Sequence, residues 1–63
     1  MRLMIVGTND VDMTVTVLVD ATRYEYALGD AYRGALVALR TRRRSPGQQL
    51  NWLKQRGVVI WKG

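Results

Sequence analysis

The 63-residue sequence contains no cysteine and no histidine. Without cysteine, disulfides, thiolate zinc sites and cysteine nucleophiles are excluded, and without histidine the commonest metal ligand is missing too. Histidine is also the only side chain whose unperturbed pKa lies near neutrality. A chain this short has a thin core, and small domains usually gain stability from disulfides, metals or oligomerisation. We therefore expect one domain over residues 1–63, with self-association to form a homo-oligomer as the remedy that the composition leaves open.

Long hydrophobic runs are absent as well. The apolar stretches are far shorter than the ~20 residues that a membrane-spanning helix needs. Met1 to Val6 is too short for a signal peptide and lacks its small-residue cleavage site. Together with the lack of cysteine, this predicts a cytoplasmic protein with no membrane partner.

Acidic residues are missing from the second half of the chain. Residues 1–30 contain all five acids together with two arginines, whereas residues 31–63 contain eight cations and no acid. The formal net charge is +5. A field this one-sided favours an anionic partner such as nucleic acid.

The first half is typical of β-strands. Arg2 to Val6 is a short apolar run that a Gly-Thr-Asn-Asp turn closes. Asp12 to Asp20 alternates between two faces, and one face is entirely apolar: Met13, Val15, Val17 and Val19. After a turn at Asp20 to Arg23, a third strand from Tyr24 to Leu28 places its two tyrosines on one face, which we expect helices to cover. These segments predict a three-stranded antiparallel meander.

The second half indicates two helices and a last strand. Asp30 can cap a helix from Ala31 to Arg43. Ser45 to Gln48 carries a capping box and a proline at the first helical position, so a second helix starts there and ends before Gly57 as its C′ residue. Val58 to Lys62 then returns to the sheet. Apolar positions expected in the core or sheet are Tyr32, Leu36, Leu39, Leu50, Leu53 and Trp61. The fold class is a small α+β domain of order β-β-β-α-α-β.

Residues that could support catalysis are few. Ser45 is the only serine, and capping explains it. The acids lie in turns or on strands without a histidine to orient them. Asn9 to Asp12 could offer oxygens to a hard cation, but such a turn is expected anyway because Asn and Asp bond their own backbone. We therefore expect no enzyme, no cofactor and no metal site.

Basic residues gather at the predicted junction between the helices. Arg33, Arg40 and Arg44 are spaced to form one stripe, and phosphate contacts by such clusters release counterions. Trp52 lies off the core face of its helix beside Arg56, where it could stack on a base. The sequence thus predicts a nucleic-acid-binding domain, with RNA favoured over DNA, through Arg33, Arg40, Arg42, Arg43, Arg44, Trp52, Lys54 and Arg56.

Two other interpretations stay open. The basic surface could serve only to keep a small protein soluble. Alternatively, the domain could be a protein-interaction module that docks on an acidic protein partner or on itself. In that case Trp52 would lie at the interface, where tryptophan is enriched.

Three short motifs occur in the order found in a known family: Tyr24-Glu25-Tyr26, Ser45-Pro46-Gly47 and Leu50-Asn51-Trp52-Leu53-Lys54. Over roughly residues 12–56 the chain resembles the KTSC domain, a module of similar length found alone in bacterial proteins and at the C-terminus of some lysyl-tRNA synthetases. The family usually has a Val-Pro pair soon after the second tyrosine, and this chain has Ala27-Leu28 there. The KTSC family is suspected to bind RNA, so the resemblance implies RNA binding for this chain.

The last third of the chain permits a second analogy, a helix-turn-helix with a wing. Two helices joined by a tight turn precede Gly57 and a strand. In this interpretation four polar residues of the second helix would face a major groove, where glutamine and asparagine can read adenine: Gln48, Gln49, Asn51 and Lys54.

Overall fold

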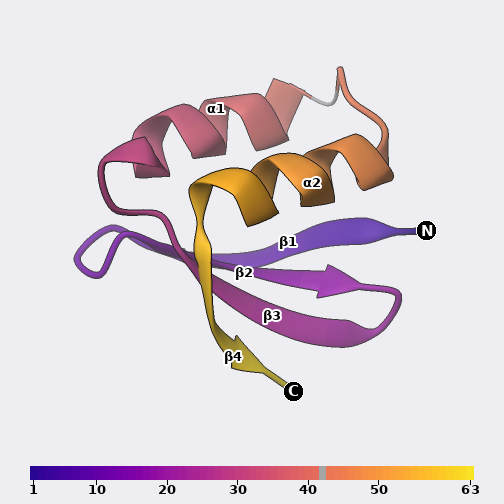
Figure 1. Cartoon of the computed structure of the whole chain (residues 1–63), viewed down its shortest axis with the longest axis horizontal. Helices are drawn as coiled ribbons and strands as arrows, with labels where there is room; N and C mark the ends of the chain where they lie inside the picture. Colours follow the sequence, from indigo (N-terminus) through magenta and orange to yellow (C-terminus); the bar gives the residue numbers. More distant parts are fainter. Residues whose placement is uncertain (42) are drawn as a thin grey trace.

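The computed structural model describes residues 1–41 and 43–63, and it contains a four-stranded antiparallel sheet under two helices. The strands β1 (Leu3–Asn9), β2 (Thr14–Val19) and β3 (Thr22–Ala27) form a meander. A 3₁₀ turn η1 (Gly29–Ala31) leads into α1 (Tyr32–Thr41), followed by α2 (Pro46–Arg56) and β4 (Val58–Lys62). The sheet order is β1-β2-β3-β4, and both helices lie on one face of the sheet (Figure 1). The predicted β-β-β-α-α-β order is confirmed.

The turns of the meander explain where the strands end. Asp20 and Ala21 both have positive φ, +49° and +71°, as in the two-residue turns whose twist suits a hairpin. The Asp20 carboxylate accepts the backbone N–H of Arg2 at 2.8 Å, which ties this turn to the start of β1. Met13 also has positive φ, so it belongs to the preceding turn and β2 starts one residue later than its apolar pattern suggests.

The core lies between the helices and the sheet. Val15, Val17 and Val19 form its floor, as their alternation predicts, and Leu53 of α2 is fully buried above the sheet. Tyr26 is fully buried too, and its ring centroid lies 6.3 Å from that of the half-buried Tyr24. The prediction that helices cover the tyrosine face of β3 is therefore confirmed.

Both helices begin close to the expected residues, but only α2 begins with the expected cap. In α2 the capping box is complete, since the Ser45 N–H donates to Gln48 Oε1 at 3.0 Å and the Gln48 N–H donates to Ser45 Oγ at 3.3 Å. The cap assigned to Asp30 is wrong, because Asp30 lies inside η1 and no side chain caps that turn. The helix α1 is described as far as Thr41, and Arg43, the predicted end, lies outside the helix. No helix described is long and apolar enough to cross a membrane.

Gly57 joins α2 to β4 in a way that the sequence did not indicate. Its backbone is extended, with φ −118°, so it is not the left-handed residue expected of a C′ glycine. A Cβ at this position would lie 2.8 Å from Leu28 Cδ2 and 3.1 Å from the Leu53 carbonyl oxygen. A larger residue at this position would therefore require Leu28 and the backbone at Leu53 and Ala27 to shift, because α2 approaches the end of β3 closely here.

The last strand lies beyond the helices. It leaves the end of α2 and runs along β3 toward the C-terminus (Figure 1). All five of its residues are exposed. Trp61 pairs with Glu25 in the sheet but is 52% exposed, so the expectation that it could pack in the core is wrong.

Candidate functional site

Trp52 of α2 lies between two arginines, Arg44 of the link before the helix and Arg56 of its last turn. Its side chain is half-buried against the core, which holds the ring in place. The guanidinium carbon of Arg56, one helical turn later, lies 4.6 Å from the ring centroid, and that of Arg44 lies 5.9 Å from it. Each such contact contributes about 0.5–1 kcal/mol at an exposed site. We call these three residues the arginine–tryptophan cluster.

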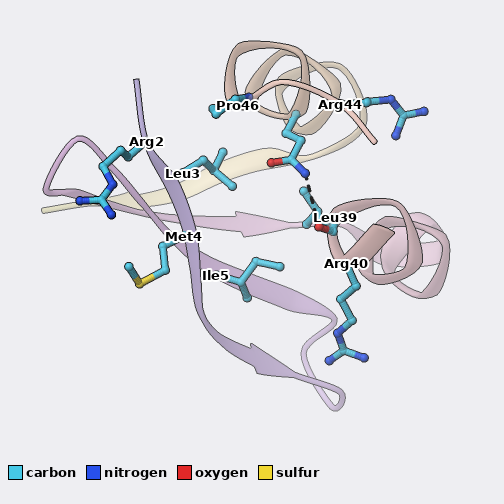
Figure 2. A pocket seen from close by; sticks show the side chains of 9 residues that line it. Arg2, Leu3, Met4, Ile5, Leu39, Arg40, Arg44 and Pro46 are labelled. Atoms are coloured by element: carbon cyan, nitrogen blue, oxygen red, sulfur yellow. Dashed lines mark hydrogen bonds between the residues drawn. The ribbon is translucent and has the colours of Figure 1, made fainter. Parts of the chain in front are cut away.

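A groove lies beside this cluster, between β1 and the corner where α1 meets α2. Its volume is about 520 Å³, and its lining combines apolar side chains with three arginines. Figure 2 shows Leu3 and Ile5 of β1 pointing toward the helices, with Leu39 of α1 across from them. The guanidinium groups of Arg2, Arg40 and Arg44 point outward in different directions around this floor (Figure 2). We call it the junction groove.

Gln49 connects the two helices at the corner of the junction groove. It is buried, and its side-chain amide donates to the Leu39 carbonyl oxygen at 3.3 Å (dashed in Figure 2). Leu39 lies in the last turn of α1, where carbonyls have no partner within the helix. The analogy in which Gln49 faces a major groove is therefore wrong, because this side chain completes the end of α1. Gln48 is likewise engaged, in the capping box of α2.

The structure brings some predicted residues together and separates others. Arg40 and Arg44 share the junction groove, and Arg44 also belongs to the arginine–tryptophan cluster. The predicted stripe is wrong because Arg44 lies outside α1. Arg33 instead lines a hollow at the opposite end of α1, which it shares with Asp10 and Asp30.

The other predicted cations in the described part of the chain are not part of the junction groove or of the arginine–tryptophan cluster. Arg43 is exposed in the link between the helices, and Arg42 falls outside the described residues. Lys54 is exposed, but two helical steps of 100° place it on the other side of α2 from Trp52. The common site therefore consists of Arg40, Arg44, Trp52 and Arg56, with Arg2 added from β1.

Sequence reasoning missed Gln55 and Arg2, although it named Gln48 and Asn51 in the helix-turn-helix analogy. A hollow of about 260 Å³ next to Trp52 is lined by Arg44, Gln48, Asn51, Trp52 and Gln55. Its α2 residues follow the i, i+3, i+4, i+7 spacing of one helical face, so this signal was present in the sequence. Arg2 carried no such signal, because it reaches the groove only through the pairing of β1 with β2.

The Asn9–Asp12 turn has a structural explanation. Asn9 Oδ1 accepts the backbone N–H groups of Val11 and Asp12, both at 3.0 Å. The Tyr32 hydroxyl donates to the Asp10 carboxylate, and this hydrogen bond raises the pKa of Tyr32, as does burial to a smaller degree. Among the described residues, no group of three Asp, Glu, His or Cys side chains is placed to hold a metal ion.

The side chains at the junction can hold anions and flat rings, since guanidinium groups pair with phosphate oxygens and stack on aromatic faces. Comparisons of the whole chain found no matching family model, no matching curated protein and no matching solved structure. The resemblance to the KTSC domain therefore stays a prediction.

Proposed function

We propose that this domain binds single-stranded nucleic acid, RNA in preference to DNA, through the junction groove and the arginine–tryptophan cluster. The observation that carries the proposal is the pair of guanidinium groups held over the Trp52 ring. A held guanidinium keeps donors free for phosphate while it loses little conformational freedom on binding.

The charge distribution supports a backbone contact. No acid follows Asp30 in the sequence, so Arg40, Arg44 and Arg56 have no acidic neighbours in their half of the chain. Arg2, in contrast, lies beside Asp20, whose carboxylate accepts its backbone N–H. The junction groove nevertheless contains more than one arginine. Three of them, Arg2, Arg40 and Arg44, surround the groove, and Arg56 continues the positive surface past Trp52. Each phosphate that they neutralise releases condensed counterions, so binding weakens as salt rises.

Base contacts would come from α2. Asn51 and Gln55 line the hollow beside Trp52, and amide side chains can donate to and accept from base edges. Stacking of a base on an aromatic or guanidinium face is worth about 1–3 kcal/mol. The proposed role is non-catalytic, and it suits the cytoplasmic location that the sequence suggests.

The proposal is tested by anisotropy titrations of labelled oligo-uridine and oligo-deoxythymidine of equal length at several salt concentrations. Affinity should be measurable at low salt, fall as salt rises, and be higher for the RNA. No binding to either oligonucleotide at low salt, or binding that ignores salt, would contradict the proposal.

A matched pair of double variants locates the site. R44A/R56A removes the arginines on Trp52, and we expect the dissociation constant to rise about tenfold or more, with a salt slope smaller by about 0.7 per lost phosphate contact. R23A/R33A removes the same charge from β3 and from the far end of α1, and should change affinity far less. Equal losses of affinity in the two double variants would show that binding depends on the net charge alone and not on this site.

A second function, docking of an acidic protein segment, is favoured by the apolar floor of the junction groove. Leu3, Ile5 and Leu39 could receive apolar side chains, which a phosphate backbone does not offer. Oligo-glutamate peptides with interspersed leucines are the appropriate competitor. Displacement of the peptide by RNA would place both ligands on one surface, and binding of the peptide alone would favour this second function.

A further inference from the structure

The strand β4 combines an apolar composition with exposure at every position. Val58, Val59, Ile60 and Trp61 are 69%, 44%, 54% and 52% exposed. In the described part of the chain the other exposed large apolar side chains are spread over the N-terminus, β1, the turn after it and α1, whereas these four are consecutive. Contiguous exposed apolar surface on a small domain marks an interaction site.

The outer edge of β4 also has free backbone groups. Among the described residues, β4 pairs with β3 alone, on one side, and a bulge interrupts this pairing at Ile60, the extra residue between Val59 opposite Tyr26 and Trp61 opposite Glu25. Beyond its end, Gly63 exchanges two hydrogen bonds with Arg23, at 2.8 Å and 3.3 Å. Because hydrogen bonding alternates along an antiparallel pair, the N–H and C=O of the neighbouring Lys62 point to the open edge. An apolar strand with an open edge is a template for pairing with another strand.

We propose that β4 pairs in antiparallel fashion with β4 of a second copy of this chain, across a two-fold axis near Ile60. The partner strand must be apolar and must have an open edge, and β4 itself meets both requirements. Such a contact uses the same edge on both copies, so it closes on a dimer. The inference does not depend on the proposed nucleic-acid binding.

The charges of β4 suit this arrangement. Lys62 is the one charged residue of the strand and lies at its end. Antiparallel pairing places the two Lys62 side chains at opposite ends of the contact, and each lies near Val58 of the other copy. A parallel arrangement would place them side by side, where like charges destabilise a strand pair.

The area sets the strength of the contact. The four apolar side chains expose on the order of 400 Å² per copy, which is within the range of functional patches. Because these side chains alternate between the two faces of the sheet, edge pairing of two copies would remove at most on the order of 800 Å² from water, less than the roughly 1,200–2,000 Å² of a stable interface. We expect a reversible dimer whose population depends on concentration between micromolar and millimolar protein.

The two-fold axis has a consequence for the helices. Antiparallel pairing of two equivalent edges places the axis perpendicular to the sheet, so α1 and α2 of both copies lie on the same side of one eight-stranded sheet. Both arginine–tryptophan clusters would then face the same way. Packing of two sheets face to face, which is the other way to cover β4, would point them in opposite directions.

Sedimentation equilibrium over this concentration range tests the dimer. Ile60→Lys puts two charges near the axis and should raise the dimer dissociation constant at least tenfold. Val37→Lys makes the same change at an exposed position of α1 and should leave it within twofold. Val58→Lys should weaken the dimer and Val58→Glu should tighten it by up to about fivefold, because position 58 lies near Lys62 of the second copy. A monomer at millimolar concentration, or equal losses in Ile60→Lys and Val37→Lys, would overturn the proposal.

Cross-linking tests the geometry without relying on charge. The chain has no cysteine, so Ile60→Cys introduces a single thiol near the axis, where opposite Cα atoms come close enough for a disulfide. Under mild oxidation it should form covalent dimers much faster than Val37→Cys. Equal rates for the two variants would overturn the β4 arrangement, and circular dichroism confirms that each variant is folded. RNA binding by the monomeric Ile60→Lys variant would show that nucleic-acid binding does not require the β4 dimer.

Discussion

The strands β2 and β4 have similar compositions and opposite environments. Both consist almost entirely of β-branched and apolar residues, yet five of the six residues of β2 are buried and all five of β4 are exposed. β2 has a neighbour on each side and lies beneath the helices, whereas β4 has one neighbour and continues past them (Figure 1). Composition therefore favours a strand, and the place of that strand in the sheet decides whether its side chains are buried.

The short connection at Gly57 accounts for the exposure of β4. A single residue separates the end of α2 from the start of β4, so the strand must begin at the rim of the helical layer. From there it can follow only the outer edge of β3.

The largest expected difference between the two strands comes from removing the same two methyl groups from each. Val17→Ala deletes them from a fully buried side chain and should lower the free energy of unfolding by about 2–3 kcal/mol, transfer and cavity terms together. Val58→Ala should change it by less than about 0.5 kcal/mol. Urea unfolding at low protein concentration, where any dimer dissociates, measures both. Comparable losses would show that β4 is covered within one chain.

A smaller effect on the free energy of unfolding is expected at Gly57, the residue that connects α2 to β4. Gly57→Ala places a Cβ against Leu28 and the Leu53 carbonyl, and should cost about 1–3 kcal/mol through overpacking. Gly34→Ala is the matched control, because its Cβ would meet no atom within 4 Å on the exposed side of α1. It should stabilise the protein by about 0.5–1 kcal/mol, as expected for an exposed helix position. A neutral Gly57→Ala would mean that β4 can move away from α2 without loss.

The smallest effects concern two tyrosines of the covered region, which should respond with opposite sign. The Tyr32 hydroxyl is held by Asp10, so Tyr32→Phe should lower the melting temperature by a few degrees. The Tyr26 hydroxyl is buried and has no hydrogen-bond partner among the described residues, so Tyr26→Phe should leave stability unchanged or raise it. Thermal unfolding monitored by circular dichroism compares them, and a loss in Tyr26→Phe would indicate a partner for that hydroxyl.

The same tyrosines predict how stability depends on pH. The Asp10 hydrogen bond raises the pKa of Tyr32, and burial followed by the charge of Tyr24 raises that of Tyr26. Their neutral forms therefore stabilise the fold fully below the ordinary tyrosine pKa of about 10, and this stabilisation is lost as pH rises through the higher folded values. Melting temperatures between pH 8 and 11 should fall less in Tyr32→Phe than in the parent chain.

Local signals predicted the elements well. The alternation from Val15 to Val19 and the Ser45–Gln48 capping box depend on neighbours in sequence, and both were confirmed. The prediction that Trp61 could be buried was wrong because a β-forming sequence has the same composition at the centre of a sheet and at its edge. The predicted stripe through Arg44 was wrong because the helical spacing does not continue past α1. The contribution of Arg2 depends on the pairing of β1 with β2, in which Leu3 lies opposite Val19, sixteen residues later in the sequence.

The Gln49–Leu39 hydrogen bond has a further consequence for recognition. Because it joins the last turn of α1 to the first turn of α2 inside the core, the two helices meet at a rigid corner. A ligand that bridges Arg40 and Arg44 would find that corner already preorganised, so little ordering entropy is lost on binding. A flexible elbow at this place would let the two guanidinium groups drift apart, and the same arginines would then behave as separate charges without a defined spacing.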